Sequence, residues 1–192
     1  MAVRQSTGSA AEPTWVTDVL QFWFAELGQT DWFTARAELD ARIRERFLSL
    51  HTRLAADDGL TVGTQRSLLA AVIVLDQFSR NLYRGTPRAF AADPLARRLS
   101  RAAIARGLDA GLTEQERMFL YLPFEHSENR DDQALAIELI GRLGNEEWTR
   151  FASDHKAMID RFGRFPHRNA ILGRASTAEE LAALEERAEW WG

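Results

Sequence analysis

The amino-acid sequence predicts an all-α protein of about eight helices that pack against their neighbours as antiparallel hairpins. Apolar residues recur at three- and four-residue steps along most of the chain, as they do on one face of a helix. The alternation of apolar and polar residues that marks a half-buried strand is nearly absent. Short connections marked by Gly or Asp separate the helical stretches, and such links usually join antiparallel neighbours.

The first half of the chain carries three helical stretches of different character. Residues 15–24 and 36–56 each carry one apolar stripe, so each is expected to bury one face. The second of these stretches ends at the turn signal Asp57-Asp58-Gly59. Residues 64–82 contain the run LLAAVIVL and are apolar on almost every side, which is typical of a buried central helix.

Capping and turn signals delimit the helices of the second half. Asp93 precedes a proline and is expected to be the N-cap of the fourth helix. Capping boxes begin at Thr113 and Thr177, and Pro123 is expected to disrupt the helix that Thr113 starts. The other helix boundaries are expected at Gly107 or Gly111, at residues 131 and 143, at residues 146 and 162, and at Trp190.

Length and composition limit the classes of protein that fit. A chain of 192 residues with 45% hydrophobic content predicts a flexible tail at residues 1–13 and a single helical domain at 14–192. The absence of cysteine excludes disulfides, thiolate metal ligands and cysteine nucleophiles. No apolar run approaches the roughly 20 residues that cross a bilayer, and the N-terminus lacks the hydrophobic region of a secretory signal. We therefore expect a cytoplasmic protein with no membrane partner.

The charged residues are unevenly distributed. A formal net charge of −4 argues against nucleic acid as a partner, because such binding needs a dominant basic face. Lys156 is the only lysine, and the arginines gather in two zones, residues 77–108 with Asp93 as the single acid and residues 161–178 with no acid. A GC-rich genome would explain the use of arginine, but planar guanidinium groups also suit bidentate binding of carboxylate or phosphate.

Three polar-aromatic segments interrupt the helical pattern, and the first of them is DQFSRN. It directly follows the buried run, so its polar side chains need partners if they are buried. Asp76 with Arg80, and Gln77 with Asn81, stand one helical turn apart and can pair. A structural network and a functional site are both compatible with Asp76, while Gln77, Arg80 and Asn81 are interpreted as ligand-binding residues.

The second segment is PFEHSE. A proline inside a helical pattern frees a backbone carbonyl and bends the chain, and such irregularities gather at functional sites. His126 titrates near neutrality and a neighbouring carboxylate can set its tautomer, so His126 and Glu125 are the predicted catalytic residues. Alternatively the segment is only a helix end, in which Ser127 or Asn129 caps the next helix and Glu128 lies on its surface.

The third segment is GRFPHRN. Gly163 is expected to end a helix, and Pro166 forces the preceding residue into extended geometry. Apolar neighbours can anchor this backbone to the core, which leaves a dense set of donors suited to a carboxylate or phosphate. Alternatively the arginines of the segment cap helix carbonyls and pair with acids elsewhere. The predicted binding residues here are Arg164, His167, Arg168 and Asn169.

Taken in order, the three segments resemble those of a bacterial family, domain-of-unknown-function family 924. The resemblance runs through LDQFSRNLYRGTPRAFAADPLAR at residues 75–97, YLPFEHSE at 121–128 and RFGRFPHRNAILGRAST at 161–177, with a weaker similarity at Trp32-Phe33. It spans nearly the whole chain after the tail and implies an all-α, tetratricopeptide-like stack of helix hairpins. It implies no activity.

Two functions follow from these observations. In the first, Arg80, Arg164 and Arg168 hold an anionic or phosphorylated small molecule, and His126 or His167 moves protons on it. In the second, the protein is a scaffold whose concave helical face binds a peptide or a partner protein. No metal and no cofactor are expected, because the H-E-x-x-H and E-x-x-H spacings and the phosphate-loop and dinucleotide fingerprints are all absent from the sequence.

Overall fold

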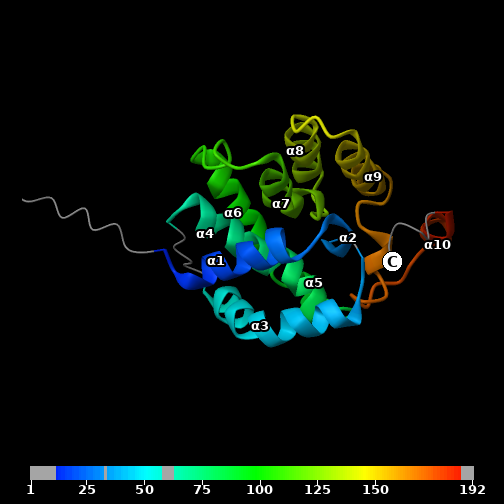
Figure 1. Ribbon diagram of the computed structural model, residues 1–192. Helices are drawn as coiled ribbons and strands as arrows, with labels where there is room; N and C mark the ends of the chain where they lie inside the picture. The colour runs from blue at the N-terminus through cyan, green and yellow to red at the C-terminus, as the bar shows by residue number, and fades with distance from the viewer. Residues whose placement is uncertain (1–11, 33, 58–62, 187–192) are drawn as a thin grey trace, which may run out of the picture.

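Helices make up the regular secondary structure of the computed structural model, which describes residues 12–32, 34–57 and 63–186 (Figure 1). The prediction of an all-α fold is therefore confirmed. Most of the expected tail and the expected helix end at Trp190 lie outside the described residues. The α-helices are α1 (Thr14–Gln21), α2 (Gln29–Trp32), α3 (Ala37–Ala56), α4 (Gln65–Val72), α5 (Ser79–Leu82), α6 (Asp93–Ala105), α7 (Glu114–Glu125), α8 (Arg130–Gly141), α9 (Glu146–Phe162) and α10 (Ala178–Glu186).

Four helical turns that are not α-helical complete the described fold. Two of them have the wider π-helical form, namely η1 (Phe22–Glu26) and η2 (Ile73–Phe78). Because η2 joins α4 to α5 without a break, residues 65–82 form one central helix, as the run LLAAVIVL predicts. The other two, η3 (Pro87–Phe90) and η4 (Pro166–Arg168), are 3-10 turns that each begin with proline.

Local capping explains where several of these helices begin and end. Both predicted capping boxes are confirmed: the Thr113 hydroxyl accepts a hydrogen bond from Glu116 N at 3.3 Å, and the Thr177 hydroxyl accepts one from Glu180 N at 3.1 Å. Gly163 ends α9 with a φ of 70°, a left-handed conformation that glycine adopts without the steric cost of a Cβ atom. This cap turns the chain into the GRFPHRN segment.

Two expectations about helix ends were wrong. Pro123 does not stop α7, which continues two residues further to Glu125. The amide of Gln133 binds carbonyls at and just beyond the end of the helix. That amide nitrogen donates to Glu125 O at 2.6 Å and to Ser127 O at 2.7 Å. Asp93 is the first residue of α6 and provides no side-chain cap, because its carboxylate binds Arg80 instead.

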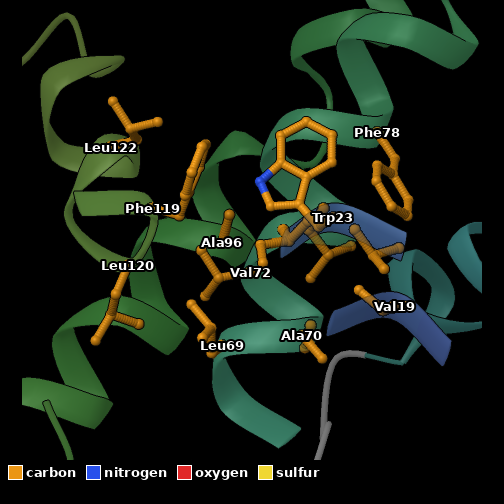
Figure 2. Close-up of a cluster of buried hydrophobic side chains, with 14 of the residues drawn as sticks. Val19, Trp23, Leu69, Ala70, Val72, Phe78, Ala96, Phe119, Leu120 and Leu122 are labelled. Carbon is orange, nitrogen blue, oxygen red and sulfur yellow. The ribbon is translucent and has the colours of Figure 1, made fainter. Parts of the chain in front are cut away.

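The main core surrounds the central helix. The helix packs against α1, α3, α6 and α7, and residues 68–79 along it are all buried. Figure 2 shows the Trp23 ring between those of Phe78 and Phe119, with ring centroids 5.5 Å and 5.4 Å away in edge-to-face arrangements. Since η1, the central helix and α7 each contribute a ring to this aromatic cluster, its packing fixes how the three elements meet.

A second, smaller apolar cluster holds the C-terminal part of the chain. Met158 and Ile159 of α9 pack with Phe165 and Ala183, so the loop that carries η4 is pinned between α9 and α10. Figure 1 shows α8 and α9 side by side, with α10 beyond α9. Among the described helices, none is long and apolar enough to cross a membrane.

We expect Phe119→Ala to lower the free energy of unfolding by about 3–5 kcal/mol, because it would leave a cavity where four aromatic rings meet. Phe119 is buried and contacts Trp32, Trp23 and Phe24, with the closest ring centroid at 4.9 Å. Urea unfolding measures the loss. The control is Leu181→Ala, which removes an exposed side chain and should change the free energy by less than about 0.5 kcal/mol. Equal losses in the two variants would contradict this account of the core.

Candidate functional site

Polar side chains from five parts of the fold, all but one of them ionisable, meet at one place, which we call the polar cluster. They come from the central helix, from the start of α6, from the end of α7, from the middle of α9 and from η4. The members of the cluster are Asp76, Gln77, Arg80, Asp93, Glu125, His126, His155, His167 and Arg168. All three polar-aromatic segments of the sequence therefore contribute to it.

Asp76 lies at the centre of the cluster and is completely buried. His126 donates from Nδ1 to its carboxylate, with both oxygens at 2.9 Å. Arg80 Nη1 lies 3.3 Å from one oxygen, and Gln77 donates to the other. Burial by itself raises the pKa of Asp76, but the charges of Arg80 and His126 and the two side-chain hydrogen bonds outweigh it and hold this pKa well below its usual range. Asp76 is therefore an ionised carboxylate at neutral pH.

The π-helical turn η2 places Asp76 and Gln77 in the cluster. A π turn closes hydrogen bonds over one more residue than an α turn, and such turns are frequent at functional sites. The Arg80 guanidinium donates to the backbone carbonyl of Asp76 as well as facing its carboxylate. The predicted pairing of Asp76 with Arg80 is present, whereas the predicted pairing of Gln77 with Asn81 is not, because each amide bonds a carboxylate instead.

Two arginines share a single carboxylate at the edge of the cluster. Arg80 binds Asp93 in a bidentate manner, with Nη1 at 3.1 Å from Oδ1 and Nη2 at 3.2 Å from Oδ2. Arg168 approaches the same Oδ2 only to 3.7 Å, beyond hydrogen-bonding distance. Asp93 therefore neutralises Arg80 much better than it neutralises Arg168.

Arg168 is a buried cation without a carboxylate of its own. Its residue surface is only 6% exposed, and its guanidinium lies over the rings of Phe90 and Phe165, with each ring centroid 4.6 Å from Cζ. Within the described part of the chain the guanidinium donates no hydrogen bond, and its Nε is fully buried. Burial, and then the nearby charge of Arg80, lowers the pKa of Arg168 to about 10. The positive charge here is incompletely compensated.

The remaining acids and imidazoles of the cluster are held neutral at neutral pH. Burial, helped by the charge of Asp76, raises the pKa of Glu125 to about 8. Glu125 Oε1 lies 3.2 Å from His155 Nδ1, which also lies 2.9 Å from the Phe151 carbonyl, and Oε2 is buried without a hydrogen-bond partner in the described chain. Burial lowers the pKa of His155 and of His167 to about 3 each, and it also lowers the pKa of His126, against the opposing charge of Asp76.

The sequence matches the model of a family described as bacterial proteins of unknown function, DUF924, over residues 19–188. The chain belongs to DUF924. Among solved structures, it resembles the protein of unknown function ATU0120 from Agrobacterium tumefaciens, with 40% identity and a TM-score of 0.85. That similarity covers 90% of this chain and 98% of the other. A comparison with curated proteins gives no match.

Some predicted binding residues of this DUF924 protein lie apart from the polar cluster. Asn81 donates to Asp40 of α3 at 2.8 Å, next to the bidentate pair of Arg84 with the same carboxylate. Arg164 binds both oxygens of Glu180, at 2.7 Å and 2.9 Å, and Asn169 donates toward the same acid at 3.3 Å. These residues tie helices and loops together, as the alternative interpretation of the segments described.

A second ion pair anchors the loop that carries Arg168. Arg174 donates to both oxygens of Glu128, at 2.8 Å and 2.9 Å, and Phe165 N donates to Glu128 at 2.8 Å. Arg174 also donates to the Phe165 carbonyl at 3.2 Å and to Asn169 Oδ1 at 2.9 Å. Glu128 therefore fixes the backbone beside Arg168.

Sequence reasoning missed two members of the cluster as site residues, Asp93 and His155. Asp93 was interpreted as a helix cap, although it is the single acid among the arginines of residues 77–108, and that isolation signals a carboxylate that an arginine will bind. His155 lies on α9 without any local motif. His51 lies elsewhere, hydrogen-bonded to Ser79 at 2.7 Å.

The described residues offer no comparable candidate for a metal site or a ligand pocket. No group of three or more His, Asp or Glu side chains is placed there to hold a metal ion. One hollow of about 470 Å³ lies at the turn between α8 and α9, and another of about 420 Å³ lies beside Arg97, Arg98 and Arg101. Neither is lined by a member of the polar cluster.

We expect Glu125→Gln to remove a pH-dependent loss of stability. The pKa of Glu125 is about 8 in the folded protein against an ordinary value of 4.5, so folding favours the protonated acid. That contribution is complete below about pH 4.5 and is lost as the pH rises toward 8. Between pH 4.5 and 7 the wild type should lose about 3 kcal/mol relative to the variant.

Urea unfolding of both proteins at several pH values between 5 and 8 measures this difference. The other titrating groups of the cluster, Asp76, His126 and His155 among them, are common to both proteins, so their contributions largely cancel. Stability curves that run parallel over this range would show that Glu125 does not take up a proton on folding.

Proposed function

We propose that this protein binds an anionic small molecule at the polar cluster, with Arg168 as the main contact. The observation that carries the proposal is that Arg168 is buried and yet lacks a counter-ion of its own. Burying an arginine costs several kcal/mol unless its charge is paired and its donors are bonded. A carboxylate or phosphate bound at the guanidinium would supply both the paired charge and the hydrogen-bond acceptors, whereas a cationic ligand would supply neither.

Three other arginines of the polar-aromatic segments and their flanks differ from Arg168 because each has a carboxylate partner. Arg164, Arg174 and Arg84 each bind a carboxylate with two donors, at distances between 2.7 Å and 3.0 Å. Arg168 is the most buried of these four arginines and the one without a hydrogen bond from its guanidinium in the described chain. Groups that destabilise the unliganded fold are typical of ligand sites, because function preserves them.

Part of the cluster is exposed to solvent. The exposed fraction of the side chain is 21% for Arg80, 18% for His155 and 15% for His126. The rings of Phe90 and Phe165 contact the Arg168 guanidinium and limit the directions from which a ligand can approach it. An approach in the plane of the guanidinium suits bidentate binding of a planar carboxylate or of two phosphate oxygens.

His126 is the group best placed to exchange a proton with such a ligand. Asp76 accepts from Nδ1, which fixes the proton there and leaves Nε2 as the basic nitrogen. Nε2 makes no hydrogen bond to the described residues and is not among the buried atoms. The protein-binding scaffold has less support, since Leu181 is the one large apolar side chain that is exposed in the described chain.

We expect Arg168→Met to weaken anion binding about ten- to hundredfold, because it removes charge-assisted hydrogen bonds to the ligand. Methionine fills the space beside the two rings without a charge, so the unliganded variant should melt at or above the wild-type temperature. Thermal unfolding and calorimetric titration with pyruvate, succinate, citrate and inorganic phosphate measure both effects.

Arg164→Met is the matched control, because it removes an arginine of the same loop that has a complete ion pair with Glu180. It should lower the melting temperature of the unliganded protein and keep the stabilisation by the anion. The proposal fails if none of the four anions stabilises the wild type. It also fails if Arg168→Met binds as well as the wild type, or melts as early as Arg164→Met.

A further inference from the structure

We propose that the anion is a small 2-oxo carboxylate, and that His126 removes a proton from the carbon beside its carbonyl group while Arg80 and Arg168 stabilise the enolate. This inference rests on the proposed anion site and adds a substrate class and a reaction to it. It draws on the chemical types in the cluster, on the Asp76–His126 pair and on the two arginines that share Asp93.

The polar cluster is equipped for proton transfer and not for covalent attack. Its members carry carboxylates, imidazoles, guanidinium groups and one amide, and none carries a hydroxyl, thiol or amine. The single lysine of the chain, Lys156, pairs with Asp160 in α9, and the sequence has no cysteine. The cluster therefore offers no hydroxyl, thiol or amine nucleophile, and both carboxylates near the arginines are already bound.

His126 has the arrangement of a general base. A buried carboxylate bound to Nδ1 orients the ring and stabilises the imidazolium that forms when Nε2 takes a proton. Arg80, also bound to Asp76, keeps that carboxylate ionised. The imidazole is neutral at neutral pH, so it can accept a proton without first losing one.

The two guanidinium groups match the charge of an enolate beside a carboxylate. Arg80 Nη2 and Arg168 Nη1 lie 3.2 Å and 3.7 Å from the same oxygen of Asp93, and both groups lie over the Phe90 ring. Arg80 also pairs with Asp76, so Arg168 is the guanidinium of the two that has no hydrogen-bonded carboxylate in the described chain. A 2-oxo acid brings one negative charge on binding and develops a second on the adjacent oxygen during the reaction.

A planar carboxylate ligand fits the chemistry of Arg168. The rings of Phe90 and Phe165 both contact the guanidinium, with each centroid 4.6 Å from Cζ, and they limit the directions from which a ligand can approach. A carboxylate and its neighbouring carbonyl are planar, so they can align their oxygens with the donors of the planar guanidinium.

The step balances without a co-reactant. The C–H bond beside the carbonyl breaks and its proton goes to His126 Nε2, while its electron pair forms a carbon–carbon double bond. The π electrons of the carbonyl move to oxygen, which becomes the enolate oxygen held by the arginines. Return of a solvent-derived proton from His126 to the same carbon restores the 2-oxo acid, so the step exchanges that hydrogen with water.

Deuterium incorporation tests the inference directly. The full chain is incubated in D₂O with pyruvate or 2-oxobutyrate, and proton NMR follows the signal of the carbon beside the carbonyl. The wild type should accelerate exchange about 10²-fold over buffer. Lactate and 2-hydroxybutyrate are the matched anions without a carbonyl, and Arg53→Ala, an exposed arginine of α3, is the matched protein control with wild-type exchange.

Variants separate binding from chemistry. His126→Gln should abolish exchange and keep the rise in melting temperature that the 2-oxo acid produces, whereas Arg168→Met should lose both. Asp76→Asn should slow exchange strongly and shift its pH dependence, because the amide can hold Nδ1 in the unprotonated state and leave the proton on Nε2. It provides a second test if His126→Gln does not fold.

The outcomes distinguish this inference from the anion site. If the 2-oxo acids stabilise the wild type but no deuterium enters, the reaction is wrong and the anion site stands. If only the hydroxy acids or inorganic phosphate bind, the substrate class is wrong. If no anion binds, both proposals fall. Exchange at the wild-type rate in a folded His126→Gln variant would exclude His126 as the base.

Discussion

The buried carboxylate of Asp76 is the constraint on which the rest of the polar cluster depends. An ionised group at zero exposure is tolerated only when several partners compensate the loss of water. Here the partners come from α5, α7 and the same π-helical turn, so the charge fixes how these elements meet. Removing a single partner would leave part of the buried charge of Asp76 without compensation. The stability of the cluster therefore depends on all of these partners together.

The charge of Asp76 also sets the protonation of its neighbours. A second ionised acid nearby would repel it, and burial adds to that effect, so Glu125 keeps its proton. The same carboxylate holds the Nδ1 proton of His126, while burial and the two arginines keep His155 and His167 neutral. The cluster therefore combines a neutral acid, an oriented imidazole and a guanidinium, that of Arg168, without a hydrogen-bonded carboxylate.

The sequence predicts most of the fold and a smaller part of the site, for different physical reasons. Helical periodicity and capping are local, so the run before Asp76 and the boxes at Thr113 and Thr177 suffice to place helices. Which polar residues meet depends on tertiary packing. Nothing local distinguishes Asn81, which bonds α3, from Arg80, one residue earlier, which enters the cluster.

The same limit explains Asp93 and His155. An aspartate before a proline at a helix start has the local signature of a cap, and only the approach of the central helix diverts its carboxylate to Arg80. His155 joins the cluster because α9 packs against α8 and α7, which places its ring 6.3 Å from that of His126. The tetratricopeptide-like stacking stays a prediction, since an all-helical fold alone does not establish it.

Arg164 and Arg168 contrast the two interpretations of the GRFPHRN segment. Both lie in one short loop, and both have the same chemistry. Arg164 has a partner in Glu180, the N3 residue of a capping box, so it joins the loop to α10. Arg168 contacts two aromatic rings and approaches one carboxylate only to 3.7 Å. The rings compensate part of the cost of burying its charge, but they accept none of its N–H groups in the plane of the guanidinium, and the proposed anion would supply those acceptors.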